Sequence, residues 1–157
     1  MHKRIAIHRV SLVREGSVPY PDPLLTTMRS SAVAAQVAAT LLRDADREHF
    51  LVFSLDRKHH VVAVNPAMIG SLVQCTVAPP EVFLPAILSR AAGIICAHNH
   101  PSGSVEPSES DRALTARLAQ AGKLLGIPVV DHIIIGFEPD GSSLYWSFGD
   151  NGCLEQI

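Results

Sequence analysis

The chain has 157 residues, of which 47% are hydrophobic and 18% charged, and its formal net charge is −2 at pH 7. This size and composition predict one well-buried domain over residues 1–157, with an N-terminal strand and connector in residues 1–29 and the core in residues 30–157. The slightly acidic balance argues against tight, sequence-independent binding to nucleic acid or to an anionic membrane. The three cysteines have no repeating spacing, and no apolar run reaches the length of a membrane span, so we expect reduced thiols, no membrane partner and a cytoplasmic location.

The first half of the chain predicts a helix and a hairpin. Residues 4–13 alternate loosely and predict a weak strand, and the prolines that follow predict a connector. Ser30 or Ser31 can cap an alanine-rich helix that ends near Asp44. The β-rich segments HFLVFSL and HVVAV flank the polar turn DRKH, and this pattern predicts a hairpin.

The second half of the chain predicts interleaved strands and helices. The expected elements are a strand at Leu72–Val77, a short helix from Pro80 to about Arg90 that Pro85 disturbs, a buried strand at Gly93–His98, a long helix from Ser108 to Gly126, a buried strand within residues 128–136 and a last strand at Leu144–Phe148. Such an order fits a single mixed sheet. The expected fold class is therefore α/β, or α+β with an antiparallel component, with helices flanking the sheet.

The stretch HNHPSGSVEPSESD, from His98 to Asp111, carries the clearest chemical signal. Because side chains alternate along a strand, His98 and His100 point the same way, with their Cβ atoms roughly 6–7 Å apart. Two imidazoles at that spacing can share one ion through bonds of about 2.0–2.1 Å. With Asp111 from the next helix they form a three-ligand set that leaves one zinc position open for water, which is typical of a catalytic zinc site.

Each part of this stretch also has a structural explanation. Ser108 and Asp111 fit a capping box at the start of a helix, and a His-x-His pair can occur at a strand end without a metal. Cys96 shares the face of His98 and His100. However, a straight strand separates Cys96 from His100 by roughly 13 Å, too far to share one ion, so we expect Cys96 to be a core residue.

Other candidate groups are weaker. The chain has no HExxH helix, no CxxC pair and no deaminase-type cysteine pair. His59 and His60 fall in the expected hairpin turn, where an exposed polar tip explains them. Asp131 and His132 interrupt an apolar strand, and a buried acid and imidazole need partners. We expect these two to bond to each other or to support the metal site from behind its ligands.

The motif His98-x-His100, seven residues, Ser108, two residues and Asp111 resembles the JAMM motif of the MPN/JAB metalloprotease superfamily. The wider runs AHNHPSG, AGKLLGI and DHIIIG resemble the RadC branch of that superfamily, historically labelled as DNA repair. The likeness extends from about Arg47 to Phe148. The chain resembles the short, stand-alone form of the family, because nothing in it matches the helix-hairpin-helix region of the longer members. One departure is Pro80, where the family usually has arginine.

The resemblance implies a single MPN/JAB domain, which is cytidine-deaminase-like in fold, and zinc held by His98, His100 and Asp111. It also implies that Glu48 is the general acid/base. The residues alone do not distinguish Glu48 from Glu15 or Glu81. A carboxylate near a zinc site can take a proton from water and pass it to a leaving amine.

The remaining implied role belongs to Ser108, whose hydroxyl would donate to the oxyanion of the tetrahedral intermediate, in competition with capping. The expected function is zinc-dependent hydrolysis of a peptide or isopeptide bond in a peptide or protein substrate. Two alternatives stay open at this point. One is a DNA-repair-associated or nucleic-acid-associated module, against which the charge balance counts, and the other is a zinc-binding scaffold without turnover.

Overall fold

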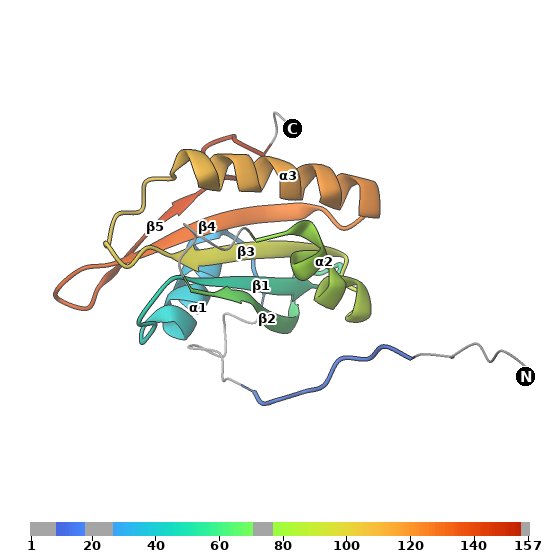
Figure 1. Ribbon diagram of the computed structural model, residues 1–157. Coiled ribbons are helices and arrows are strands. Elements are labelled where there is room, and N and C mark those ends of the chain that lie inside the picture. Colours follow the sequence, from blue (N-terminus) through green and yellow to red (C-terminus); the bar gives the residue numbers. More distant parts are fainter. Residues whose placement is uncertain (1–8, 18–26, 71–76, 155–157) are drawn as a thin grey trace, which may run out of the picture.

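The computed structural model describes residues 9–17, 27–70 and 77–154. Within these ranges, five strands form one mixed sheet in the order β2-β1-β3-β4-β5, flanked by three helices (Figure 1). The elements are α1 (Ser31–Leu42), β1 (His49–Leu55), β2 (Val61–Ile69), α2 (Pro79–Leu88), β3 (Gly93–Asn99), α3 (Glu109–Leu125), β4 (Val129–Phe137) and β5 (Ser143–Ser147). This architecture confirms the predicted fold class. None of the helices in the described ranges is long and apolar enough to cross a membrane.

Most predicted elements are present with small differences at their ends, but β2 continues to Ile69, five residues beyond the predicted segment HVVAV. The β1–β2 hairpin, the capped α1 and the helix–strand succession of the second half are confirmed. The prediction of a strand in residues 4–13 is wrong for the part that the structure describes, because residues 9–13 have no regular structure. Val10 and Val13 stay 66% and 81% exposed, so this alternating segment buries no apolar face that would hold it as a strand. Residues 4–8 and most of the strand expected at 72–77 lie outside the described residues.

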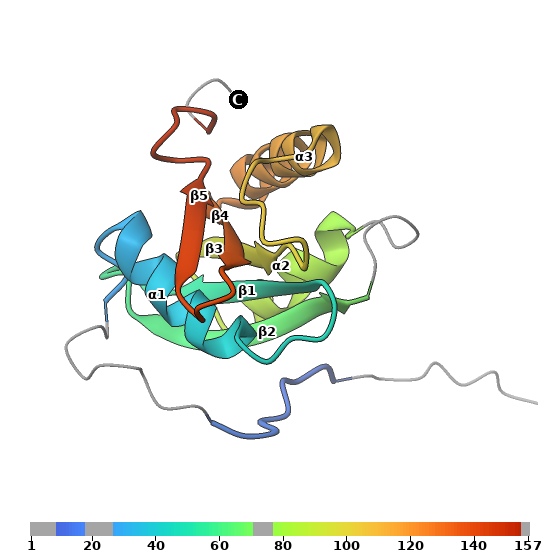
Figure 2. The same cartoon turned by 90° about the vertical axis from the view of Figure 1, so that its left-hand side faces the viewer.

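The helices cover the two faces of the sheet. α1 packs on one face, where Phe53, Ala97 and Ile135 belong to its core cluster. α2 and α3 pack on the other face, as Figure 2 shows, and there Phe50 and Cys96 join their cluster. Because β3 is central and covered on both faces, all seven of its residues are buried, which explains the nearly continuous apolar run GIICA.

Alternation along β3 determines which face receives the chemistry. Ala97 faces α1, so Cys96 and His98 face α2 and α3. The chain then leaves the end of β3 and returns through the loop of residues 100–108 to the start of α3, at the same end of the sheet (Figure 1). The fold thereby brings the first turn of α3 next to the histidines.

Candidate metal centre

His98 and His100 meet at the end of β3, as their spacing predicts. The His98 ring is fully buried, and its Nε2 lies 3.0 Å from Nε2 of His100. The chain is held beside β4 where His100 N donates to the Ile135 carbonyl at 2.9 Å. Two ring nitrogens at this distance need a proton or another cation between them, because two lone pairs that face each other repel.

The loop after β3 orients the His100 ring. Nδ1 of His100 lies 2.8 Å from the Ser104 carbonyl oxygen, which can only accept, so Nδ1 is the donor and the lone pair of the neutral ring is on Nε2. Gly136 on β4 lets this loop come close, since a Cβ at that position would overlap the Gly103 carbonyl oxygen. The direction of the His100 lone pair thus depends on a contact between two backbones.

Asp111 serves two structures with its two carboxylate oxygens. Oδ2 accepts from the Ser108 amide at 2.8 Å and from the Ser108 hydroxyl at 2.6 Å, and Asp111 N donates to Ser108 Oγ, so the predicted capping box is present. Oδ1 lies 3.3 Å from His98 Nε2, is buried, and makes no hydrogen bond with the described residues. The capping and ligand explanations are therefore compatible, because each uses a different oxygen.

The charges of this group favour a cation. Burial raises the pKa of Asp111, but its contacts with His100, His98 and Ser108 outweigh burial and hold that pKa well below the ordinary value. The same contact with Asp111 raises the pKa of His100, against the opposing effect of burial. A buried carboxylate beside two imidazoles stabilises a positive charge at the point they share.

The distances fit a tetrahedral metal ion. Zinc bonds of about 2.0–2.1 Å place neighbouring ligand atoms of a tetrahedron roughly 3.3 Å apart. Two separations correspond to this value: 3.0 Å between the two Nε2 atoms and 3.3 Å from His98 Nε2 to Asp111 Oδ1. His100 Nε2 also lies 3.5 Å from Asp111 Oδ2, the oxygen that accepts in the capping box. The structure therefore brings His98, His100 and Asp111 together in an arrangement that can hold a metal ion.

Glu48 completes the centre from the position just before β1. Its Oε1 lies 3.9 Å from His98 Nε2, and Glu48, His98 and His100 offer ligand atoms within 4.8 Å of one another. The antiparallel register pairs Phe50 with His98, and two further residues along it place Glu48 opposite His100. The signal that distinguishes Glu48 from Glu15 or Glu81 is this strand pairing, which no local motif contains.

Asn99 holds the backbone on both sides of Glu48. Its Nδ2 donates to the Arg47 carbonyl at 3.0 Å, and its Oδ1 accepts from the His49 amide at 2.9 Å. Gly70 N also donates to the Glu48 carbonyl at 2.9 Å. No motif in the sequence marks Asn99. Its position between the two histidines implies only that its side chain points to the opposite face of β3.

Asp131 Oδ1 accepts from the His132 backbone amide at 2.7 Å, as one of the two expectations had it, but the two side chains point to separate surroundings. The His132 ring lies behind His98, with Nε2 at 2.9 Å from His98 Nδ1, and burial lowers the pKa of His132 well below its ordinary value. Asp131 instead accepts from Ser147 Oγ at 2.7 Å and from Gly149 N at 2.9 Å. Its side chain thus joins β4 to the end of β5, and His132 is the member of the pair that contacts the centre.

The other candidate residues lie away from the centre. Cys96 is fully buried among apolar side chains, as expected, and burial raises the pKa of its thiol. In the hairpin turn, Asp56 accepts from the Lys58 and His60 amides, and its other oxygen lies 3.1 Å from the His60 ring, which accounts for that polar tip. Cys96 therefore belongs to the core and His60 to the hairpin turn, and we do not include either among the metal ligands.

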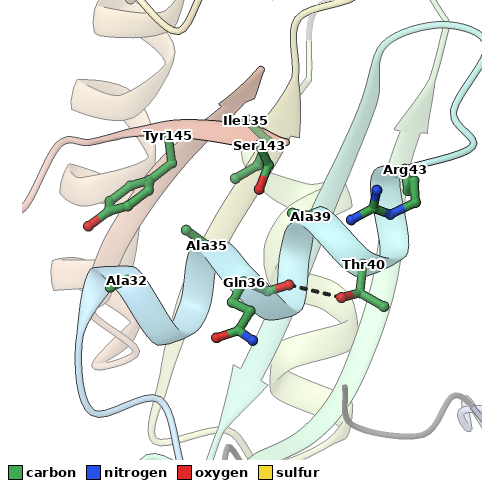
Figure 3. A pocket seen from close by; sticks show the side chains of 9 residues that line it. All are labelled: Ala32, Ala35, Gln36, Ala39, Thr40, Arg43, Ile135, Ser143 and Tyr145. Atoms are coloured by element: carbon green, nitrogen blue, oxygen red, sulfur yellow. Dashed lines mark hydrogen bonds between the residues drawn. The ribbon is translucent and has the colours of Figure 1, made fainter. Parts of the chain in front are cut away.

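A groove of about 300 Å³ lies on the opposite face of the sheet, between α1 and β5 (Figure 3). Three alanines of α1, together with Gln36, Arg43 and Tyr145, form much of its lining. None of the residues of the metal centre contributes to it. The chemistry of the histidines is therefore separate from this groove.

The fold and the centre together define a mixed α/β domain of the JAB/MPN type. Residues 28–153 match the family model of the RadC-like JAB domain, so the chain belongs to the RadC-like JAB domain family. Among its relatives, a UPF0758 protein of Rubrobacter xylanophilus is 45% identical over 113 residues, which cover 72% of this chain and 47% of that protein.

Other relatives are also named UPF0758 proteins. A UPF0758 protein of Pelobacter propionicus is 48% identical over 113 residues, covering 72% of this chain and 47% of the relative. One from Desulfitobacterium hafniense is 43% identical over 134 residues, covering 85% of this chain and 57% of the relative. The chain spans about half the length of these curated relatives.

Proposed function

We propose that the chain is a JAMM-type zinc metallopeptidase that hydrolyses a peptide or isopeptide bond. The observation that supports this function best is the convergence of two Nε2 atoms, 3.0 Å apart, with the buried Asp111 carboxylate, whose Oδ1 lies 3.3 Å from His98 Nε2 and whose Oδ2 lies 3.5 Å from His100 Nε2. The Glu48 carboxylate lies beside them. His98, His100 and Asp111 would hold the ion. When bound, zinc would polarise the scissile carbonyl and lower the pKa of a water molecule.

The two carboxylates suit different roles. Asp111 is fixed by the capping box, is almost completely buried, and has Oδ1 3.3 Å from His98 Nε2, as a ligand requires. Glu48 lies farther away, at 3.9 Å, and its side chain is 13% exposed. A carboxylate with contact to solvent can exchange protons, so Glu48 is the better general base.

The reaction moves a proton from the attacking water to the leaving amine, and Glu48 can carry it in two steps. Glu48 takes a proton from the attacking water as the new C–O bond forms, and then passes it to the amine nitrogen as the C–N bond breaks. Ser108 can donate to the oxyanion after its hydroxyl turns from Asp111 Oδ2. While the hydroxyl rotates, the Ser108 amide would keep its hydrogen bond to Asp111 Oδ2, so the N-terminus of α3 would remain capped.

A panel of peptide and isopeptide substrates, incubated with and without a zinc chelator, tests this function. We expect cleavage that the chelator abolishes and added zinc restores. Glu48→Gln is expected to keep its zinc and to lose about 10²–10⁴-fold in turnover. Zinc retention with no cleavage of any substrate in the panel would favour a binding scaffold, and unchanged turnover in Glu48→Gln would remove that residue from the mechanism.

A further inference from the structure

A buried chain of polar side chains connects α3 to His98 through β4. Thr115 Oγ1 lies 2.6 Å from the Asp111 carbonyl oxygen and 2.6 Å from His132 Nδ1, and His132 Nε2 lies 2.9 Å from His98 Nδ1. We propose that Thr115 and His132 are positioning residues, which hold His98 in the tautomer whose Nε2 lone pair faces the metal position. This inference rests on the metal centre proposed above.

The order of protons along this chain follows from the Thr115 hydroxyl. The hydroxyl has one proton, and the Asp111 carbonyl oxygen can only accept, so at 2.6 Å the proton lies between these two oxygens. Thr115 Oγ1 must then accept from its other neighbour, His132 Nδ1. The hydroxyl therefore places the His132 proton on Nδ1.

The His132 ring passes this order on to His98. His132 is fully buried, and its side-chain bonds go to Thr115 and His98, so no carboxylate among these partners supports a charged ring. A neutral ring with its proton on Nδ1 has a lone pair on Nε2, and His98 Nδ1 must donate to it. His98 Nε2 is left with the lone pair that faces His100 and Asp111.

Ring packing keeps both imidazoles in this orientation. Phe50 stacks on His98 with ring centroids 5.8 Å apart and an interplanar angle of 13°. Phe148 stacks on His132 at 5.0 Å and 9°. Rotation of either ring would disturb these stacks and break the hydrogen bonds between the rings. The packing thus supports the proton order that Thr115 sets.

The arrangement links the two parts of the centre. Thr115 is one helical turn after Asp111, and its hydroxyl bonds to the carbonyl of that residue. The first turns of α3 therefore supply a carboxylate ligand and also orient an imidazole ligand on β3. Ligand-supporting hydrogen bonds of this kind typically change metal affinity by about 10–100-fold.

Nitrogen-resolved NMR of the histidine rings in the metal-free wild-type protein tests the proton order directly. We expect His98 and His132 each to carry one proton, on Nδ1. A proton on Nε2 of His98, or a rapid average of both tautomers, would overturn the proposal. This measurement needs neither a variant nor a substrate, so it decides the matter even where a substitution prevents folding.

Substitution of Thr115 tests the effect on the metal. Thr115→Val keeps the shape and removes the hydroxyl, and we expect its zinc affinity, measured against a competing chelator, to fall by about 10–100-fold. Thr115→Ser is expected to restore most of that loss. Thr40→Val is the matched control, because Thr40 makes the same bond to the carbonyl four residues earlier, that of Gln36, but on α1. Unchanged affinity in folded Thr115→Val would contradict the proposal.

These results separate the inference from the proposed function. Zinc binding with the expected tautomer, but without cleavage of any substrate, would overturn the peptidase function and leave the roles of Thr115 and His132 intact. Cleavage in a protein whose Thr115→Val variant keeps full zinc affinity would do the reverse. The two failures are therefore distinguishable.

Discussion

Asn99 brackets Glu48: its carboxamide bonds to the Arg47 carbonyl and to the His49 amide, the backbone groups on either side of the proposed general base. The last residues of β3 and the residue after it therefore supply two imidazoles from alternate positions, and Asn99 between them is a clamp on the backbone that carries Glu48. The pairing of β1 with β3 explains how one strand end can organise both the ligands and the base.

Removal of this clamp should affect turnover more than metal binding. In Asn99→Ala we expect zinc content to stay at the wild-type level and hydrolysis to fall by about 100-fold, because a base displaced by about 1 Å reacts far more slowly. Metal analysis and steady-state kinetics on a substrate cleaved by the wild type measure both effects. Asn151→Ala, which loses a single bond to the Ser147 carbonyl, is the control. Loss of zinc in Asn99→Ala would show that the clamp acts on the ligands instead.

The three proposed ligands should be individually required for the metal. We expect about one zinc ion per chain in the wild type and loss of that zinc in His98→Ala and in Asp111→Ala, since each removes one of three protein ligands. Metal content after dialysis against a weak chelator measures this. His60→Ala, in the hairpin turn, should keep its zinc. Retention of zinc in both ligand variants would refute the assignment of the site.

Ser108 should contribute to stability and to turnover separately. Ser108→Ala removes the cap of α3, and we expect the free energy of unfolding to fall by about 1 kcal/mol. Ser30 caps α1 through the Val33 amide, far from the centre, so Ser30→Ala should lose a similar amount of stability with no change in hydrolysis. A fall in hydrolysis that appears in Ser108→Ala alone would support the oxyanion role. Equal turnover in both variants would leave capping as the function of Ser108.

Zinc affinity should fall on acidification. A zinc ion and a proton would compete for the lone pair of His100 Nε2. Contact with Asp111 raises the pKa of that ring in the metal-free protein. Below this raised pKa the proton occupies Nε2, and above it the lone pair is free, so affinity should be full at alkaline pH and decline from above the ordinary histidine value of about 6.5. Chelator competition between about pH 8 and pH 5 measures the decline. Constant affinity over this range would exclude His100 as a ligand.

The sequence predicts much of the fold because local patterns suffice for it. The apolar run before His98, the capping signal at Ser108 and the glycine at residue 126 set the ends of β3 and α3 to within about a residue. The His98 and His100 juxtaposition follows from strand alternation alone. These predictions need no knowledge of which strands are neighbours.

The remaining features of the centre depend on contacts between distant segments. Glu48 reaches His100 through the register of β1 with β3, and Thr115 reaches His98 through a ring on β4. Neither relation leaves a periodic signal, because register and helix placement are set by the packing of the whole sheet. The Asp131 carboxylate shows the same limit, since its partners lie on and after β5.

Gly136 meets the Gly103 carbonyl oxygen with no room for a methyl group, and Gly103 itself adopts φ +82°, a conformation that suits glycine. The loop that aims His100 is therefore seated on a position of β4 that has no chemical function. Even the single methyl group of alanine at residue 136 would overlap the Gly103 carbonyl oxygen. A change there would move the loop and turn a ligand away, so a position without a reactive group helps determine whether the domain can hold its metal.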